Sequence, residues 1–354
     1  MTLRPEDVFP LGARLPPFAL IDVRSPVEVA RGALPFARAL PLMSDEERHQ
    51  VGLRYRDAGQ EAAIELGYEL AGPHLPERTR AWREATAAGP SAVTCWRGGL
   101  RSALAVEMIG RPDALAVRGG YKGLRGHLAS NLGVALERKQ LVVIAGLTGS
   151  GKTEVVRELL GVDPSLQVLD LEGEARHRGS AFGAHDTAQP SQATFENALA
   201  AALVLDPAGM VVVEDESRFV GARTLPAPLF EAMTSAPVVI LEVPLARRAE
   251  RIFAEYVRAP THRLGVGATR SRLEDALGRL RSRLGGARTK ALIAALHDAE
   301  ATWDDPVAHR GWIVPLLEGH YDRLYDRSMT AQPRRVLARG DAETIIAALL
   351  AMAR

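Results

Sequence analysis

Short apolar runs alternate with glycine-containing loops and amphipathic stretches along the first third of the chain. Residues 18–25, "FALIDVRS", form an apolar run that ends in charged residues, as expected of a buried strand. Residues 91–110, "SAVTCWRGGLRSALAVEMIG", follow the pattern of a strand, a Gly-rich loop and a helix, and residues 114–129 begin with another short strand and turn. This alternation of strands and helices predicts a mainly parallel sheet covered by helices.

The same pattern starts again at Gln140. Residues 141–160, "LVVIAGLTGSGKTEVVRELL", predict a buried strand, a glycine loop and a helix. The apolar runs in 209–217 and 236–244 predict two further buried parallel strands. A capping box at Ser271–Glu274 predicts that a later helix begins there.

The pattern therefore predicts two α/β domains of different fold. A chain of 354 residues is long for a single hydrophobic core. We expect a first domain at 1–126, a connecting helix or linker at 127–139, and a second domain at 140–354 with an Arg-rich helical segment at 247–290.

Composition excludes several classes of protein. Hydrophobic residues make up 47% and charged residues 25%, as in ordinary globular proteins. No uncharged apolar run approaches the roughly 20 residues that span a bilayer, and the first residues lack the basic and apolar stretches of a signal peptide. We expect a cytoplasmic protein without a membrane partner. The single cysteine excludes an internal disulfide, and the spacing of the nine histidines does not predict a zinc site.

Charge is balanced overall but not locally. The chain has 44 Lys and Arg against 43 Asp and Glu, whereas residues 247–290 contain 12 basic and 4 acidic residues, and 11 of the 12 are arginine. The planar guanidinium of arginine binds phosphate through two parallel hydrogen bonds, so this segment is a candidate binding surface for a polyanion. The candidates for phosphate contacts are Arg247, Arg248, Arg251, Arg270, Arg272, Arg279, Arg281 and Arg283.

Residues 146–153, "GLTGSGKT", match the phosphate-binding motif G-x-x-x-x-G-K-[ST]. Its glycines let backbone N–H groups surround phosphate oxygens, its lysine reaches the terminal phosphates, and its threonine coordinates Mg²⁺. The motif follows a predicted strand and precedes a predicted helix, as this site requires. The expected diphosphate-binding residues are Gly146, Gly149, Ser150, Gly151, Lys152 and Thr153.

Such a loop normally shares its magnesium ion with a carboxylate at the end of a neighbouring strand. The strand "MVVVEDES" supplies Glu214 and Asp215 at its end. We expect Thr153 and one of these two carboxylates to hold Mg²⁺, although adjacent acids are also typical of a solvated strand end. The motif indicates a bound diphosphate or triphosphate and does not single out ATP.

The single cysteine, Cys95, opens a polar Gly-rich loop rather than an apolar core segment. Loop amides and the following helix N-terminus are expected to point at its sulfur, to lower its pKa and to hold an oxyanion or a persulfide beside it. Arg101 adds a charged clamp, and Trp96 serves either for packing or for stacking on a base. The expected anion loop comprises Trp96, Arg97, Gly98, Gly99, Leu100 and Ser102, with Cys95 and Arg101 as the catalytic pair.

The first domain resembles a rhodanese domain. The resemblance is carried by "IDVRSPVEVARGALPFARALPL" at 21–42 and by the cysteine loop. Residues 32–37, "GALPFA", depart from the Gly-His-Ile-Pro-Gly-Ala turn of that family. Five residues separate Cys95 from Arg101, one more than in many sulfur-transferring rhodaneses, and cysteine phosphatases share this spacing. The fold class is therefore expected to be α/β, with a rhodanese-like parallel-sheet domain followed by a P-loop NTPase-like domain.

The order of motifs over nearly the whole chain resembles the tRNA 2-selenouridine synthases. It is carried by "CWRGGLRS", "GLTGSGKTE", "DLEGEARHRGSAFG", "QPSQATFEN" and "VVVEDESR". The resemblance implies a transferase that replaces the sulfur of wobble 2-thiouridine in tRNA by selenium. Selenophosphate is the selenium donor, and an S-geranyl nucleoside made from geranyl diphosphate is the intermediate. Cys95 would serve the selenation step, either carrying selenium covalently or positioning a selenium anion, and residues 146–153 would hold the prenyl diphosphate.

Other candidates and other functions stay open at this point. Glu172, Arg178 and Ser180 lie in the polar segment 169–183, which either binds the donor or the nucleoside or forms a surface loop. The alternatives are a P-loop kinase or NTPase with a sulfur-sensing rhodanese domain, a binding protein without catalysis, and a plain sulfurtransferase. The first alternative predicts rapid phosphate release from ATP that survives Cys95→Ala.

Overall fold

The computed structural model describes residues 1–179, 182–183 and 187–354. The chain forms two compact units, one of residues 1–138 with 190–207 and the other of residues 139–189 with 208–354. The sequence division placed residues 190–207 in the second domain, whereas in the structure they pack within the first unit.

The first unit is built on a five-stranded sheet in the order β1-β5-β4-β2-β3, with every neighbouring pair parallel. This arrangement confirms the parallel sheet expected from the alternating pattern. Its elements are β1 (Thr2–Leu3), α1 (Pro5–Val8), β2 (Ala19–Asp22), α2 (Pro26–Ala30), β3 (Ala37–Ala39), α3 (Asp45–Ala71), the 3-10 helix η1 (Gly72–His74), α4 (Leu75–Ala85), β4 (Ser91–Thr94), α5 (Leu100–Ile109), β5 (Ala114–Val117), α6 (Gly120–Glu137) and α9 (Gln192–Leu205).

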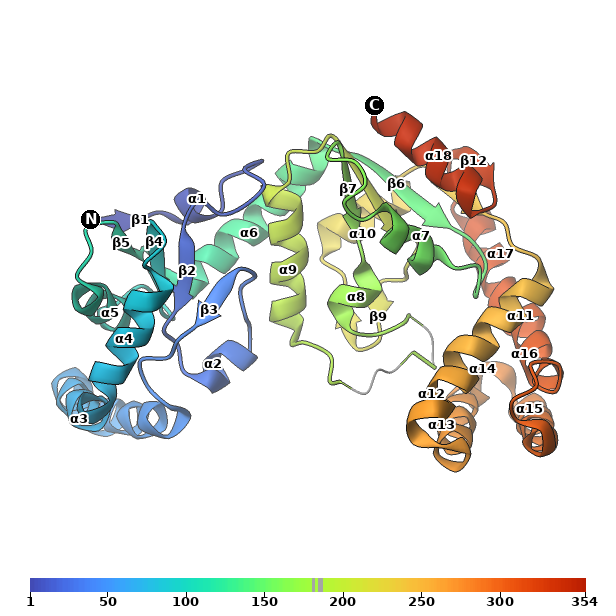
Figure 1. Ribbon diagram of the computed structural model, residues 1–354, viewed down its shortest axis with the longest axis horizontal. Helices are drawn as coiled ribbons and strands as arrows, with labels where there is room; N and C mark the ends of the chain where they lie inside the picture. Colours follow the sequence, from blue (N-terminus) through green and yellow to red (C-terminus); the bar gives the residue numbers. More distant parts are fainter. Residues whose placement is uncertain (180–181, 184–186) are drawn as a thin grey trace. The chain divides into compact units, whose positions relative to one another are not determined.

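Helix α6 is a packed part of the first unit rather than a linker. Its buried residues recur every four positions at Leu124, Leu128 and Leu132, which places them on one face. Helix α9 lies beside α6, and Arg125 of α6 pairs with Glu196 of α9 at 2.6 Å (Figure 1). The sequence separates α9 from α6 by the whole phosphate-loop segment, so periodicity alone does not predict this pairing.

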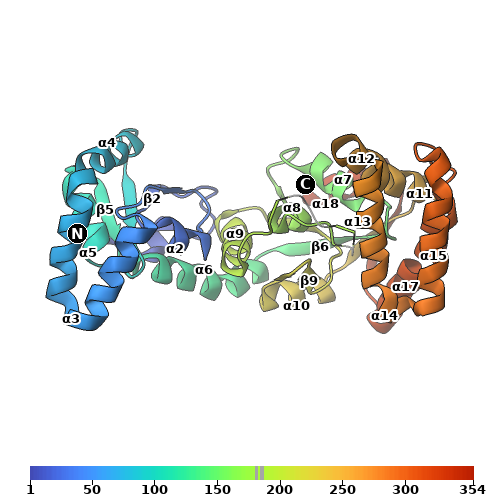
Figure 2. The same ribbon diagram turned by 90° about the horizontal axis from the view of Figure 1, so that it is seen from below.

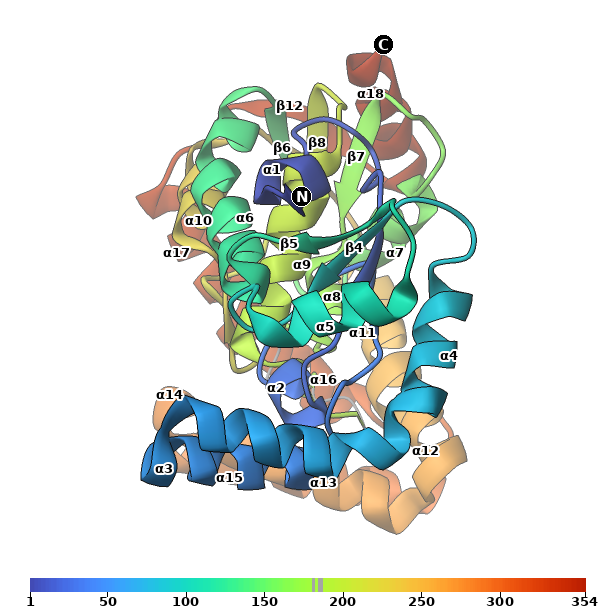
Figure 3. The ribbon, with the colours of Figure 1, turned by 90° about the vertical axis from the view of Figure 1, so that its left-hand side faces the viewer.

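Helix α3 turns back on itself at Gly59. This glycine has φ 83°, a left-handed conformation that disfavours a side chain. A Cβ added to Gly67 would lie 3.8 Å from Cγ2 of Val51, so the two halves of α3 run side by side. Figure 3 shows both halves, in blue, along one edge of the unit.

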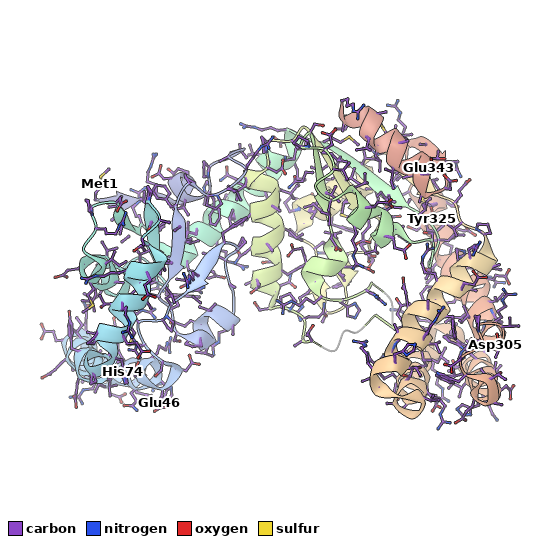
Figure 4. All side chains as sticks on the ribbon, in the orientation of Figure 1. Met1, Glu46, His74, Asp305, Tyr325 and Glu343 are labelled. Carbon is purple, nitrogen blue, oxygen red and sulfur yellow. The ribbon has the colours of Figure 1, made fainter. Side chains whose placement is uncertain are left out.

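A polar cluster fixes the start of α3 to the elements that follow it. Arg78 of α4 pairs with Glu47 of α3 at 2.9 Å, and His74 of η1 lies 3.7 Å from the same carboxylate. Figure 4 shows the neighbouring Glu46 and His74 at the same end of the unit. The helical hairpin is therefore held to the body of the unit at its first turn.

The second unit contains a five-stranded parallel sheet in the order β12-β11-β6-β8-β7. Figure 2 shows α7 and α18 on one side of strand β6 and α10 on the other. The elements that complete this sheet region are β6 (Gln140–Ala145), α7 (Lys152–Leu159), β7 (Leu166–Leu169), α8 (Leu171–Ala175), β8 (Met210–Glu214), β9 (Phe219–Val220), β10 (Arg223–Thr224), α10 (Ala227–Ser235), β11 (Val238–Leu241), β12 (Val336–Gly340) and α18 (Ala342–Ala353).

The Arg-rich segment at 247–290 and the helices that follow it share a hydrophobic core. Phe253, Leu277 and Trp312 are among the residues buried together there. Helix α13 begins at Val266 after Gly265, so the capping box expected at Ser271–Glu274 is wrong and lies inside the helix. The elements are α11 (Leu245–Phe253), the π-helix η2 (Ala254–Arg258), α12 (Ala259–Leu264), α13 (Val266–Arg279), α14 (Arg281–Leu284), α15 (Gly286–Asp298), the 3-10 helix η3 (Ala299–Thr302), α16 (Arg310–Leu316), the π-helix η4 (Leu317–Tyr321) and α17 (Asp322–Ala331).

Within the described residues, the structure has no helix whose length and apolar character would let it cross a bilayer.

Candidate functional site

The cysteine loop connects the end of β4 to the start of α5. Gly98 has φ 69°, and a Cβ there would collide with the carbonyl oxygen of Val117 and lie 2.9 Å from the nitrogen of Gly119. The first N–H groups of α6 hold the loop from the other side, because Tyr121 N donates to Cys95 O at 2.8 Å and Lys122 N donates to Trp96 O at 3.1 Å. The loop is therefore built into the fold and has no room for larger residues at Gly98.

Cys95 is buried, with 3% of its surface exposed, yet it lines a cavity. Its Sγ lies 3.4 Å from the hydroxyl oxygen of Ser102, and this oxygen lies 3.0 Å from Gly99 O, so the single hydroxyl proton can be donated to either atom. Burial alone would raise the pKa of the Cys95 thiol. Hydrogen bonds from the side chain and backbone of Ser102, together with the charge of Arg101, outweigh burial and hold this pKa below its usual value. The surroundings therefore favour the thiolate.

Arg101 is clamped by a buried carboxylate. Its guanidinium donates to both oxygens of Glu28, at 2.6 and 3.2 Å, and Glu28 is 6% exposed. Burial would raise the pKa of Glu28, but the hydrogen bond and charge of Arg101 lower it. Such a bidentate pair fixes the orientation of the guanidinium beside the loop. Arg101 thus acts on Cys95 as an oriented positive charge.

A second arginine, Arg24, packs against the aromatic side chains beside the cysteine loop. Arg24 is fully buried, and its Nη2 donates to Asp22 at 2.6 Å. Its guanidinium lies 3.7 Å from the centre of the Tyr121 ring, which stacks on Trp96 at 5.3 Å between ring centres. Trp96 is 39% exposed, so it packs against Tyr121 with one part and faces solvent with another.

A cavity of about 580 Å³ adjoins the cysteine loop, and its walls are mainly apolar. Residues of the cysteine loop and of both halves of α3 line the cavity, and the loop contributes Cys95, Trp96, Arg97, Gly99, Leu100 and Arg101. The contribution of α3 to this cavity was not predicted from the sequence. The missed signal is helical spacing on either side of Gly59, with Arg48, Val51, Gly52 and Tyr55 before it and Gln60, Ala63, Ile64 and Gly67 after it.

The phosphate-binding loop lies between β6, the central strand of the second sheet, and α7. Gly149 and Gly151 have φ 79° and 89°, so both occupy the left-handed region that glycine tolerates. Lys152 Nζ donates to Gly146 O at 3.0 Å, across the mouth of the loop. Ser150 is buried with 2% of its surface exposed. The predicted diphosphate-binding residues thus come together in one loop.

Two carboxylates converge on the hydroxyl of Thr153. This hydroxyl donates to Glu214 at 2.9 Å and to Glu172 at 3.0 Å. Burial and the nearby charge of Glu172 raise the pKa of Glu214 to about 7. Glu172, which the sequence offered as a substrate contact, therefore belongs to the same cluster as Thr153.

Glu216 completes a group of three carboxylates at this loop. One ligand atom from each of Glu172, Glu214 and Glu216 lies within 4.8 Å of the others. Burial and the charges of the other two raise the pKa of Glu216 well above its usual value. Crowded carboxylates of this kind are destabilised unless they are protonated or bind a cation, and carboxylate and hydroxyl oxygens are suitable Mg²⁺ ligands. The donor set therefore fits the magnesium ion that a phosphate-binding loop uses.

The carboxylate of Asp215 pairs with Arg334 rather than with Thr153. Both of its carboxylate oxygens accept hydrogen bonds from Arg334, at 3.0 and 2.8 Å. Asp215 follows the last residue of β8 and its carboxylate is held by Arg334, whereas Glu214 is held by Thr153. Of the two carboxylates that the sequence proposed for Mg²⁺, the structure brings only Glu214 to Thr153.

The candidate arginines separate into structural and exposed groups. Arg248 is 3% exposed and makes two hydrogen bonds of 2.8 Å to Asp322, so it is a buried structural residue rather than an exposed phosphate contact. Arg251 donates to Glu154 and to Gly149 O in the phosphate loop. Arg270 is half-buried and pairs with Glu274 and Glu300, and Arg272 is half-buried. The exposed candidates are Arg247, Arg279, Arg281 and Arg283.

Of the remaining candidates, Arg178 lies 3.7 Å from Glu255, and its guanidinium is 5.7 Å from the centre of the Tyr256 ring. Ser180 lies outside the described residues.

The second unit has the defining features of a P-loop domain: a phosphate-binding loop after the central strand of a parallel sheet and a carboxylate from the adjacent strand. Residues 139–354 match the family model described as the tRNA 2-selenouridine synthase AAA domain. The chain is 42% identical over 341 residues to the tRNA 2-selenouridine synthase of Cupriavidus necator, with 91% of each chain covered.

Two further relatives carry the same name. The protein of Chromohalobacter salexigens is 43% identical over 343 residues, covering 93% of this chain and 92% of the relative. The protein of Marinobacter nauticus is 40% identical over 364 residues, covering 98% and 97%. The chain belongs to the tRNA 2-selenouridine synthase family, which is a family of enzymes.

Proposed function

We propose that this enzyme converts wobble 2-thiouridine of tRNA to 2-selenouridine in two steps, through an S-geranyl intermediate. The family membership supports the overall reaction. The two loops support the division into steps, because each loop is suited to a different anion. A tRNA substrate and two phosphorylated donors also support the expected location in the cytoplasm.

In the first step, the thiocarbonyl sulfur bonds to C1 of geranyl diphosphate while the bond from C1 to the diphosphate oxygen breaks. The N3 proton of the base is released with the diphosphate. Lys152 and the loop N–H groups bind the diphosphate and stabilise the charge that develops on it. Thr153, Glu214 and Glu172 would hold Mg²⁺, which supplies further charge neutralisation to the leaving group when bound.

In the second step, the selenium of selenophosphate bonds to C2 of the base and the bond from C2 to sulfur breaks, which releases geranyl thiol. Water then cleaves the selenium–phosphorus bond and gives 2-selenouridine and phosphate. The thiolate-favouring surroundings of Cys95 and the fixed charge of Arg101 support a role for this loop in binding and directing the selenium nucleophile.

The exposed arginines of the helical segment are our candidates for tRNA binding. Arg247, Arg279, Arg281 and Arg283 are exposed to solvent, where a tRNA phosphate can reach them. Contacts of this kind release counterions, so tRNA affinity should fall steeply with salt concentration.

The main observation behind the proposal is that one chain of this family contains two anion-binding loops. One loop contains the Cys95 thiol, and the other contains Lys152. The test is digestion and mass spectrometry of 2-thiouridine tRNA incubated with the enzyme, Mg²⁺, geranyl diphosphate and selenophosphate, omitting each donor in turn. We expect S-geranyl nucleoside without selenophosphate, 2-selenouridine with both donors, and unchanged 2-thiouridine without geranyl diphosphate. Unchanged nucleosides in every reaction, together with ATP hydrolysis that survives Cys95→Ala, would support the kinase or NTPase alternative.

A further inference from the structure

The cavity beside Cys95 combines an apolar interior with a charged wall. Its interior includes Leu42, Met43, Val51, Ile64 and Leu104. Arg48, Arg97 and Arg101 also line it, and Arg48 is 44% exposed. An apolar pocket with a few polar groups at one side suits a ligand that has an apolar chain and an anionic or polar head.

The cavity opens to solvent through large apolar side chains. Tyr55 and Tyr68 of α3 are 59% and 48% exposed, and Leu100 of the cysteine loop is 52% exposed. All three line the cavity. Exposed apolar side chains gathered around one opening are typical of a binding site, whereas scattered ones are ordinary surface.

The volume of the cavity suits a prenylated base. The cavity measures about 580 Å³. With about 30 Å³ for each water-sized group, a ten-carbon chain needs roughly 300 Å³, which leaves room for part of a pyrimidine ring. The only nucleophilic thiol of the chain lies in the same wall, so a chain attached through sulfur to C2 of the base would end next to the reacting atoms.

We propose that this cavity, between the two halves of α3 and the cysteine loop, binds the geranyl chain of the S-geranyl nucleoside during selenation. The inference rests on the proposed two-step function and assigns a specificity site to its second step. The apolar chain fixes C2 near Cys95 and Arg101, and Arg48 and Arg97 face the phosphates of the nucleotide or the selenium donor. The geranyl group then has two roles: it binds the nucleoside to the first unit, and it leaves with the sulfur.

The test uses the full-length enzyme, selenophosphate and tRNA that already carries either S-geranyl- or S-methyl-2-thiouridine. We expect wild-type enzyme to prefer the S-geranyl substrate in kcat/KM by at least about 100-fold, because burial of each additional methylene favours binding. Ile64→Trp fills the cavity from the second half of α3. We expect it to lower kcat/KM for the S-geranyl substrate by at least about 10-fold and to change the S-methyl reaction by less than about 2-fold.

Leu53→Trp is the matched control, because Leu53 lies on α3, is 37% exposed and is not part of the cavity lining. Equal losses on both substrates in Ile64→Trp would overturn the inference and indicate that the cavity holds the nucleoside itself. The wild-type ratio provides a test that needs no variant, since equal kcat/KM for the two substrates would also overturn it. If the proposed function itself is wrong, the result differs: wild-type enzyme would form no 2-selenouridine from the S-geranyl substrate.

Discussion

The cysteine loop and the phosphate-binding loop share a local construction but differ in what surrounds them. Each follows a parallel strand, turns through glycine and leads into a helix. The cysteine loop has an apolar cavity and two arginine–carboxylate pairs around it, one fully buried and one partly buried. The phosphate loop has a lysine and three clustered carboxylates. The helix N-terminus thus supplies a general affinity for anions, and the neighbouring side chains decide which chemistry each loop supports.

The difference between the loops also concerns how they are held in place. The cysteine loop is supported by Glu28, Asp22 and Arg24 from the start of its own unit. The phosphate loop is supported from the Arg-rich segment, because Arg248 donates to Thr148 O and Arg251 to Gly149 O. Arginine therefore serves as an internal support in both units, a role that substitution can separate from ligand binding.

The largest expected effect is on stability. Arg248→Ala leaves Asp322 as a partly buried carboxylate without its partner, and breaking a buried pair costs about 3–5 kcal/mol. We expect a lower free energy of unfolding in urea titrations. Arg247→Ala is the control, since Arg247 is 76% exposed at its side chain and its removal should change stability by less than about 0.5 kcal/mol. Equal stability of the two variants would contradict the assignment of Arg248 as a support.

The next effect distinguishes Glu214 from Asp215. Glu214→Gln removes a charged oxygen beside Thr153, so the Mg²⁺ concentration that gives half-maximal prenylation should rise by about 10–100-fold. Asp215→Asn should weaken the pair with Arg334 and leave the Mg²⁺ dependence close to wild type. Prenylation rates measured over a Mg²⁺ series check both. A larger shift for Asp215→Asn than for Glu214→Gln would exclude our choice between the two carboxylates.

A smaller effect concerns the thiol. Alkylation by iodoacetamide needs the thiolate, so a lowered pKa makes Cys95 react at lower pH than an ordinary cysteine. Ser102→Ala removes a hydrogen bond that lowers the pKa of the Cys95 thiol, so the midpoint of the rate–pH profile should move upward. Ser282→Ala, on α14 in the other unit, should leave the profile unchanged. A midpoint that stays in place or falls in Ser102→Ala would show that this hydrogen bond does not set the thiol pKa.

The smallest expected effect concerns tRNA binding. If Arg281 contacts a phosphate, Arg281→Ala should reduce the slope of log K against log salt concentration by about one. Arg111→Ala is the control, because Arg111 pairs with Asp113 at 2.7 Å in the first unit. Filter-binding titrations at several salt concentrations measure the slope. Identical slopes for Arg281→Ala and wild type would remove Arg281 from the binding surface.

The sequence predicted those parts of the molecule that depend on local pattern. Buried strands, the glycine loops and the positions of Lys152 and Thr153 follow from neighbouring residues, and the parallel sheets confirm the expected α/β class. The start of α13 at Val266 was not predicted, because Gly265 ends the preceding helix and the new helix begins without a side-chain cap. The polar residues at 271–274 gave a capping signal that tertiary packing overrides.

The features that the sequence did not predict depend on partners that are distant in the sequence. Arg334 lies more than a hundred residues from Asp215, so nothing near Asp215 indicated that its carboxylate is already paired. Arg248 and Asp322 are 74 residues apart, so nothing near Arg248 in the sequence indicated that it differs from the other arginines of the basic segment. The cavity beside Cys95 depends on the reversal at Gly59, and a single glycine within a polar helical stretch is a weak signal for a hairpin. The rhodanese assignment of the first domain stays a prediction.

The central claim is that the two loops serve consecutive steps on one nucleoside. The most direct measurement is mass spectrometry of wobble nucleosides after tRNA is incubated with both donors and either Cys95→Ser or Lys152→Ala enzyme. We predict that Cys95→Ser accumulates S-geranyl-2-thiouridine and forms no 2-selenouridine, whereas Lys152→Ala leaves 2-thiouridine, with prenylation lowered by at least about 100-fold. The same product pattern from both variants would contradict the claim.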